Sequence, residues 1–170
     1  MFFPVYEPAP WQRGVQKIAA LPFVSGILAQ ILHRLDPFVL DSTHGKRTAT
    51  TLVTGLPVVW LTTTGAHSGK TRTVPLVGIP DDSRLLLVAS YFGKDHNPGW
   101  YYNLKANPVV HIRLNGSQVC CMAQEVGPDE YNRLWEKAIE MYHGYSKYKQ
   151  RAAGRRIPLI TLTLLDHSQR

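Results

Sequence analysis

The stretch LTTTGAHSGKTR, residues Leu61 to Arg72, decides how this chain folds, because an apolar strand runs directly into a turn of small residues. Threonine and serine hydroxyls, together with backbone N–H groups near Gly65 and Gly69, can converge there on the oxygens of a phosphate. Lys70 and Arg72 then add two fixed positive charges. A plain hairpin turn would use the same residue types, because Ser, Thr and Gly favour turns for local reasons. The stretch therefore predicts a strand, a turn and a second strand, with a candidate anion site at the turn.

A second stretch, ASYFGKDHNPGWYYNLKANP at residues 89–108, predicts a loop followed by a short helix. We expect the loop over Tyr91 to Gly99 and the helix over Trp100 to Ala106. Asn107-Pro108 ends the helix, because the residue before a proline disfavours the helical conformation. A third stretch, MYHGYSKY at residues 141–148, spaces three tyrosines by three, and Ile157-Pro158 precedes a closing strand.

Together these stretches resemble the deazaflavin-dependent nitroreductase family. The resemblance rests on the Thr-Thr-Thr-Gly turn with Ser68, Gly69 and Arg72, on the run from Asn97 to Pro108, and on the tyrosine spacing; it spans Pro57 to Leu165. It implies a small split β-barrel that binds coenzyme F-420, a phosphorylated and polyglutamylated 8-hydroxy-5-deazaflavin. It also implies an oxidoreductase that passes a hydride from the reduced coenzyme to a quinone, a nitro compound or an activated enone.

The resemblance implies which residues form the site. The turn, the strand after it and the loop of the second stretch would hold the coenzyme; these positions are Thr64, Gly65, His67, Ser68, Gly69, Lys70, Arg72, Val74, Pro75, Leu76, Ala89, Ser90, Tyr91, Phe92, Lys94, Asn97, Trp100 and Tyr101. Tyr142, Tyr145 and Tyr148, with Ser90, would stand at the mouth of the pocket and hydrogen-bond a substrate oxygen as hydride arrives.

Each of these roles has a structural alternative. The tyrosines can simply pack on the barrel, above all Tyr142, which also continues the apolar stripe of the preceding helix. A buried tryptophan near a loop usually fills the core, so Trp100 is interpreted as support for the site. Arg72 can instead be a surface cation paired with Asp81 or Asp82.

The turn departs from the family at one place. Many relatives carry arginine or lysine where this chain has Ala66 and His67, so one or two cations are missing. Lys70 and Lys94 would compensate; otherwise F-420 binds weakly or another ligand replaces it. His67 is either a phosphate partner that strengthens when protonated or a turn residue. FMN is the alternative cofactor, and a non-catalytic carrier of a fatty acid, haem or similar ligand is the alternative function, because fold does not settle function.

Hydrophobic patterning outlines the rest of the fold. Strands are expected over residues 57–64, 73–79, 84–90, 109–114, 118–126 and 157–165, and Asn115-Gly116 is a strong hairpin signal. A helix should begin at Pro128 with a core-facing stripe of Tyr131, Leu134, Trp135, Ala138, Ile139 and Tyr142. The predicted fold class is α+β: a single-domain split β-barrel of the FMN-binding-like kind, of about six strands, with an N-terminal helix and a helix before the last strand.

We expect a flexible N-terminal arm over residues 1–20 and a split-barrel deazaflavin-binding domain over residues 21–170. A helix is expected over Phe23 to Leu35, where apolar residues repeat at three and four positions and Asp36-Pro37 stops it. We expect neither a secretory signal nor a spanning helix, because charged residues and Pro22 interrupt any window of about 20 apolar residues. The apolar face of the helix expected over Phe23 to Leu35 either packs over the barrel or makes peripheral contact with the inner face of a membrane.

Charge and cysteine content narrow the function classes. With 19 Lys and Arg against 12 Asp and Glu, the net charge of +7 favours an anionic partner. A nucleic acid is not expected, because the cluster of Arg151, Arg155 and Arg156 lacks interleaved aromatic residues. Cys120 and Cys121 are adjacent and form no disulfide framework, which favours the cytoplasm. The histidines show no metal-ligand spacing, so no metal is predicted, and a monomer is expected.

Overall fold

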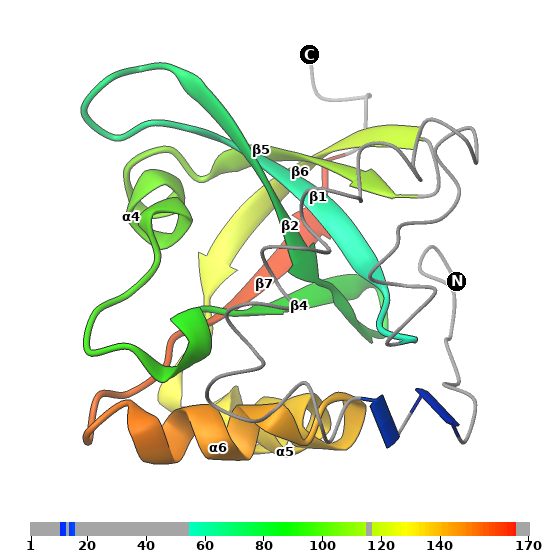
Figure 1. Ribbon diagram of the computed structural model, residues 1–170. Coiled ribbons are helices and arrows are strands. Elements are labelled where there is room, and N and C mark those ends of the chain that lie inside the picture. The colour runs from blue at the N-terminus through cyan, green and yellow to red at the C-terminus, as the bar shows by residue number, and fades with distance from the viewer. Residues whose placement is uncertain (1–10, 13, 16–54, 115–116, 166–170) are drawn as a thin grey trace.

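Seven strands and the helices α4 to α6 make up most of the described chain, which comprises residues 11–12, 14–15, 55–114 and 117–165 of the computed structural model (Figure 1). In chain order the elements are β1 (Val58–Thr64), β2 (Thr71–Val77), β3 (Ile79–Asp81), β4 (Arg84–Val88), the short 3-10 turn η1 (Tyr91–Gly93), α4 (Gly99–Ala106), β5 (Val109–Leu114), β6 (Ser117–Glu125), α5 (Pro128–Met141), α6 (Gly144–Arg151) and β7 (Leu159–Leu164).

The strands form one antiparallel sheet in the order β2-β1-β5-β6-β7-β4-β3. The sheet curls into a half-barrel, with α4 against one end and α5 and α6 side by side beneath β4 and β7 (Figure 1). The pairing of β5 with β6, from Val109 opposite Met122 to Leu114 opposite Ser117, confirms the predicted hairpin. The predicted α+β class is confirmed as well.

Gly78 creates the corner that curls the sheet. Its N–H donates to the Pro57 carbonyl at 2.9 Å. A Cβ on Gly78 would lie 2.9 Å from side-chain carbons of both Val59 and Leu85, so a larger residue would have to displace these buried side chains. Gly78 lies between β2 at one edge of the sheet and β3 at the other edge. This corner divides the strand predicted over residues 73–79, and it accounts for seven strands where about six were predicted.

The half-barrel has a core on each side of β4. Leu85 and Leu87 lie in the interior cluster with Leu61, whereas Leu86 and Val88 lie in the cluster between the sheet and helices α5 and α6. A strand covered on both faces is apolar at every position, which explains the continuous run of leucines that the sequence shows here.

Helix α5 begins at Pro128, as predicted, and buries Leu134, Trp135 and Ala138. Helix α6 was not predicted, because its sequence is polar and basic. Only its tyrosine face, Tyr145 and Tyr148, is buried together with Gly144. Figure 1 shows the two helices forming a single layer under the sheet.

A buried carboxylate joins α5 to the β3–β4 hairpin. The Asp81 side chain is only 1% exposed and accepts hydrogen bonds from Arg84 at 2.9 Å, Arg133 at 3.0 Å and Lys137 at 2.8 Å. Hydrogen bonding from Arg133 is the main cause that holds the pKa of Asp81 well below its usual range, and Lys137 and Arg84 add to it while burial opposes it. Asp81 is therefore ionised and neutralised where the helix meets the sheet.

The helix expected over Phe23 to Leu35 lies outside the described residues, as do the Asn115-Gly116 turn residues themselves. Of the arm expected over residues 1–20, only residues 11–12 and 14–15 are described, and these are helical. Within the described ranges, no helix combines the length and the apolar character needed to cross a membrane.

Candidate functional site

The turn between β1 and β2 is closed by its own backbone. The Gly65 N–H donates to the Lys70 carbonyl, and the Gly69 N–H donates to the Gly65 carbonyl, both at 2.9 Å. The Lys70 N–H also points to the Ser68 hydroxyl at 3.4 Å. The predicted turn is therefore present as a compact unit closed by its own hydrogen bonds.

Helix α4 supports this turn from behind. The Asn103 amide accepts from the Ala66 N–H at 3.1 Å and donates to the Thr63 hydroxyl at 3.1 Å. One turn later, Asn107 donates to the Thr64 carbonyl at 3.4 Å. Residues four apart share a helix face, so the spacing of the two asparagines places both against β1. Neither asparagine was predicted to have this role, although both belong to the motif that carries the resemblance.

The turn presents positive charge that no carboxylate of the described residues balances. His67, Ser68, Lys70 and Arg72 are exposed, and among the described residues neither Lys70 nor Arg72 has an acidic group within ion-pair distance. The alternative partner for Arg72, Asp81, is buried and already bound by three other cations. Arg72 therefore does not pair with Asp81, and the ion pairs of the described residues do not join it to Asp82 either.

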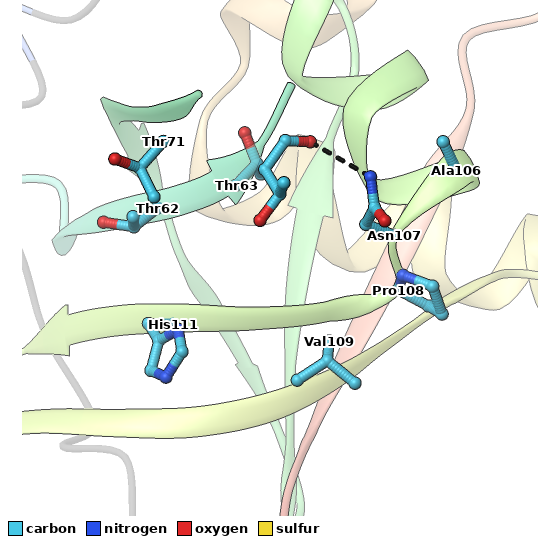
Figure 2. Close-up of a pocket in the computed structure, with 9 residues that line it drawn as sticks. Thr62, Thr63, Thr71, Ala106, Asn107, Pro108, Val109 and His111 are labelled. Carbon is cyan, nitrogen blue, oxygen red and sulfur yellow. Dashed lines mark hydrogen bonds between the residues drawn. The ribbon is translucent and has the colours of Figure 1, made fainter. Parts of the chain in front are cut away.

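A hollow of about 420 Å³ lies beside the base of this turn (Figure 2). It is lined by Thr62, Thr63, Thr64, Thr71, Ala106, Asn107, Pro108, Val109 and His111. Of the residues predicted to bind the coenzyme, only Thr64 lines it. Ala89 to Phe92, which were also predicted to hold the coenzyme, do not line this hollow.

The loop after β4 has an unusual backbone. Ala89 is fully buried in the half-barrel and Ser90 is 8% exposed. Tyr91, Phe92 and Gly93 then follow with φ of 48°, 58° and 81°, three successive left-handed residues. The Lys94 ammonium lies 4.3 Å from the centre of the Tyr91 ring. Lys94 therefore points back along its own loop.

The other predicted contacts divide between the interior and the surface. In β2, Val74 and Leu76 pack against the interior cluster, whereas Pro75 lies opposite Trp60 and takes the other face of the strand. Trp100 is 8% exposed and belongs to the interior cluster, in line with its supporting role. The Tyr101 hydroxyl donates to Glu125 at 3.0 Å.

The three tyrosines form one aromatic cluster between α6 and the sheet. Tyr142, Tyr145 and Tyr148 are 7%, 5% and 4% exposed, and their ring centres lie 5.3 to 6.1 Å apart, edge to face. The three side chains are therefore buried and do not line an open mouth in this structure. Their contact with a substrate stays a prediction. The Tyr142 and Tyr148 hydroxyls are hydrogen-bonded to each other at 3.2 Å, with either one able to donate, while the Tyr145 hydroxyl has no hydrogen-bond partner within the described chain.

Burial also affects the chemistry of these phenols. Desolvation raises the pKa of Tyr142 and of Tyr145 far above the ordinary value of 10.0, and neighbouring tyrosines add to the effect. The pKa of Tyr148 is raised too, again mainly by burial. All three remain protonated hydrogen-bond donors at neutral pH.

Comparison with known proteins shows which family this chain belongs to. The profile of the F420H(2)-dependent quinone reductase family matches residues 33–163. The chain belongs to this family. An F420H(2)-dependent quinone reductase of Mycobacterium tuberculosis is 39% identical over 110 residues, which cover 63% of this chain and 73% of that protein. A second M. tuberculosis protein, whose name proposes the same activity, is 34% identical over 107 residues, which cover 63% of this chain and 89% of its own length.

Solved structures agree with the family. An F420-H2-dependent reductase superposes with a TM-score of 0.57 at 36% identity, covering 62% of this chain and 93% of that one. A protein described as a domain-swapped dimer gives a TM-score of 0.60 at 31% identity, and the match covers 79% of this chain and 98% of that chain. The haem storage protein HutZ of Vibrio cholerae shares the fold alone, with a TM-score of 0.50 at 14% identity and coverage of 78% and 91%.

These findings confirm three predictions. The fold is a split β-barrel, the coenzyme of the family is F-420, and the protein is an oxidoreductase of the F420H(2)-dependent quinone reductase family. The non-catalytic carrier and the FMN enzyme are not favoured, because the matching profile and the named relatives all refer to F-420. Which residues hold the coenzyme stays a prediction.

Proposed function

We propose that this protein transfers a hydride from reduced F-420 to a quinone, with the β1–β2 turn as the phosphate site. The observation that carries the proposal is the turn itself. It is pre-formed by its own hydrogen bonds, supported by Asn103, and edged by Lys70 and Arg72 without a carboxylate partner in the described chain. A pre-formed cationic turn binds phosphate oxygens at little ordering cost.

Family membership determines what the chain has to contribute chemically. The deazaflavin supplies the hydride when bound, so the residues are needed to orient it, to exclude water and to hold a proton. The loop of residues 89–92 would support the ring, and Lys94 and His67 would extend the charged surface toward the anionic tail. Tyr145 would donate its proton to the substrate oxygen, because its hydroxyl is the one of the three tyrosine hydroxyls without a partner in the described chain.

Nitro compounds and activated enones are proposed as further substrates. Like a quinone, each presents an oxygen that gains negative charge as the hydride is transferred. A neutral phenol stabilises that charge whichever of these groups carries it. The proposed donor therefore favours a broad substrate range, which parallel assays with a benzoquinone, a nitroaromatic compound and a cyclic enone would measure.

Arg72→Ala should weaken binding of oxidised F-420 at least about tenfold, since one charge-assisted hydrogen bond contributes roughly 1.5–3 kcal/mol. Fluorescence titration of the purified protein with F-420 measures this, with FMN titrated in parallel. Arg113→Ala is the matched control, because it removes an exposed arginine of β5 on the strand next to β1. Equal losses in both variants would indicate general electrostatic attraction and remove Arg72 from the site.

A further inference from the structure

Arg155 joins three separate points of the loop that follows β4. Its Nη2 donates to the Ser90 carbonyl at 3.0 Å and its Nε donates to the Lys94 carbonyl at 3.1 Å. Its Nη1 donates to the side-chain oxygen of Asn97. Arg155 stands in the segment between α6 and β7, so one guanidinium ties the C-terminal part of the chain to residues 90–97.

The loop that Arg155 holds is strained. Left-handed backbone is unfavourable for residues with a side chain, and Tyr91 and Phe92 adopt it in succession before Gly93. Gly93 packs directly on α6: a Cβ there would lie 2.7 Å from the Tyr148 carbonyl and from the Arg151 Cβ. Such a conformation persists only where its surroundings over-determine it. The hydrogen bonds from Arg155 and the packing on α6 are the surroundings seen here.

The acceptors show that the interaction of Arg155 with the loop is more than a surface ion pair. All three are neutral oxygens, two of them backbone carbonyls, so the interaction defines positions along the loop. The planar guanidinium presents several N–H groups in fixed directions, which a lysine ammonium cannot reproduce. The same loop touches the tyrosine cluster, since the Phe92 and Tyr148 rings lie edge to face at 5.9 Å.

We propose that Arg155 is a positioning residue for the coenzyme: through its hydrogen bonds to residues 90–97 it keeps Tyr91, Phe92 and Gly93 in the left-handed conformation, and the loop so held supports the deazaflavin ring. The proposal rests on the proposed function for its ligand. Its structural half, that Arg155 determines the loop conformation, is independent of any ligand. Arg155 is not a catalytic residue, because it acts through the loop.

The structural half is tested by hydrogen–deuterium exchange on the ligand-free protein. The Gly93 N–H is bonded to the Ser90 carbonyl and the Lys94 N–H to the Tyr91 carbonyl. Arg155→Ala should raise exchange of the 91–97 peptide at least about tenfold, whereas β5 and β6 peptides stay protected. Arg156→Ala is the control, because its guanidinium lies 4.3 Å from the Tyr131 ring centre and makes no loop contact in the described chain. Unchanged loop exchange in Arg155→Ala overturns the proposal.

The functional half is tested by titrating oxidised F-420 into the same variants. Arg155→Ala should raise Kd at least about tenfold, Arg155→Lys should fall between it and the wild type, and Arg156→Ala should change Kd less than about twofold. If Arg155→Ala does not fold, Arg155→Lys provides both readouts. Faster loop exchange with an unchanged Kd overturns the positioning role. A wild-type protein that binds no F-420 contradicts the proposed function instead, and the exchange data still decide whether Arg155 holds the loop.

Discussion

Replacing Tyr145 by phenylalanine is expected to lower kcat for quinone reduction by about 100-fold, within the range that a positioned proton donor contributes. The affinity for F-420 should stay within roughly twofold, because the change removes one hydroxyl that makes no hydrogen bond in the described chain. Steady-state kinetics with reduced F-420 and a water-soluble benzoquinone measure kcat, and fluorescence titration measures the affinity.

This substitution is a clean test because of the hydrogen bonds around it. Tyr145→Phe breaks no hydrogen bond of the described chain, so the free energy of unfolding should change by less than about 0.5 kcal/mol. Tyr142→Phe or Tyr148→Phe would break the 3.2 Å contact between their hydroxyls and should destabilise the protein by about 1 kcal/mol. Tyr102→Phe, on a side chain that is 50% exposed, is the control for turnover. Wild-type turnover in Tyr145→Phe would leave Tyr145 as a packing residue.

The pH profile adds a second criterion. Burial raises the pKa of Tyr145, so its phenol should remain protonated well above neutral pH. If Tyr145 is the proton donor, kcat should not fall between about pH 7 and about pH 10, because the phenol stays protonated over that range. A decline with an apparent pKa below about 9 would assign the proton donor to another group.

Local patterns in the sequence predicted much of this fold. The β1–β2 turn, the β5–β6 hairpin and helix α5 each follow from residues close together in the chain, so propensity and periodicity are sufficient. The corner at Gly78 could not be predicted in this way, because its cause is the approach of Val59 and Leu85, which only the closed half-barrel brings together. Helix α6 was missed because its single apolar face consists of two tyrosines in an otherwise polar segment.

In the candidate site, too, some features follow from the local sequence and others depend on the three-dimensional fold. The cationic turn is local and was predicted in detail, yet its support by Asn103 depends on α4 packing against β1. Arg155 was interpreted only as part of a basic cluster, because nothing in its neighbourhood indicates acceptors about sixty residues earlier in the chain. The burial of the three tyrosines likewise depends on how α6 lies against η1. Residue type suggested hydrogen bonding, but only the fold determines which hydroxyls are already paired.

Replacing Asp81 by asparagine is expected to lower the free energy of unfolding by about 3 kcal/mol near neutral pH. Removing one partner of a buried ion pair costs roughly 3–5 kcal/mol when the remaining charge is trapped. Here the three cations are 29%, 52% and 36% exposed and can regain water, so the lower end of that range applies. The midpoint of thermal unfolding should fall by roughly 6–12 °C for a domain of this size. Asp82→Asn, an exposed neighbour in the same turn, is the control and should change stability by less than about 0.5 kcal/mol.

The dependence on pH distinguishes an ion cluster from simple packing. The native-state pKa of Asp81 is depressed, so its contribution is complete above the unfolded-state value of about 3.9 and is lost as pH falls below it. The stability difference between wild type and Asp81→Asn should therefore be constant from about pH 7 to about pH 5 and should shrink below about pH 4. Urea unfolding at several pH values measures it. If the stability difference between wild type and Asp81→Asn stays unchanged at low pH, the charge of the Asp81 carboxylate is not what joins α5 to the sheet. Side-chain packing would then hold α5, the helix that supports α6, in place.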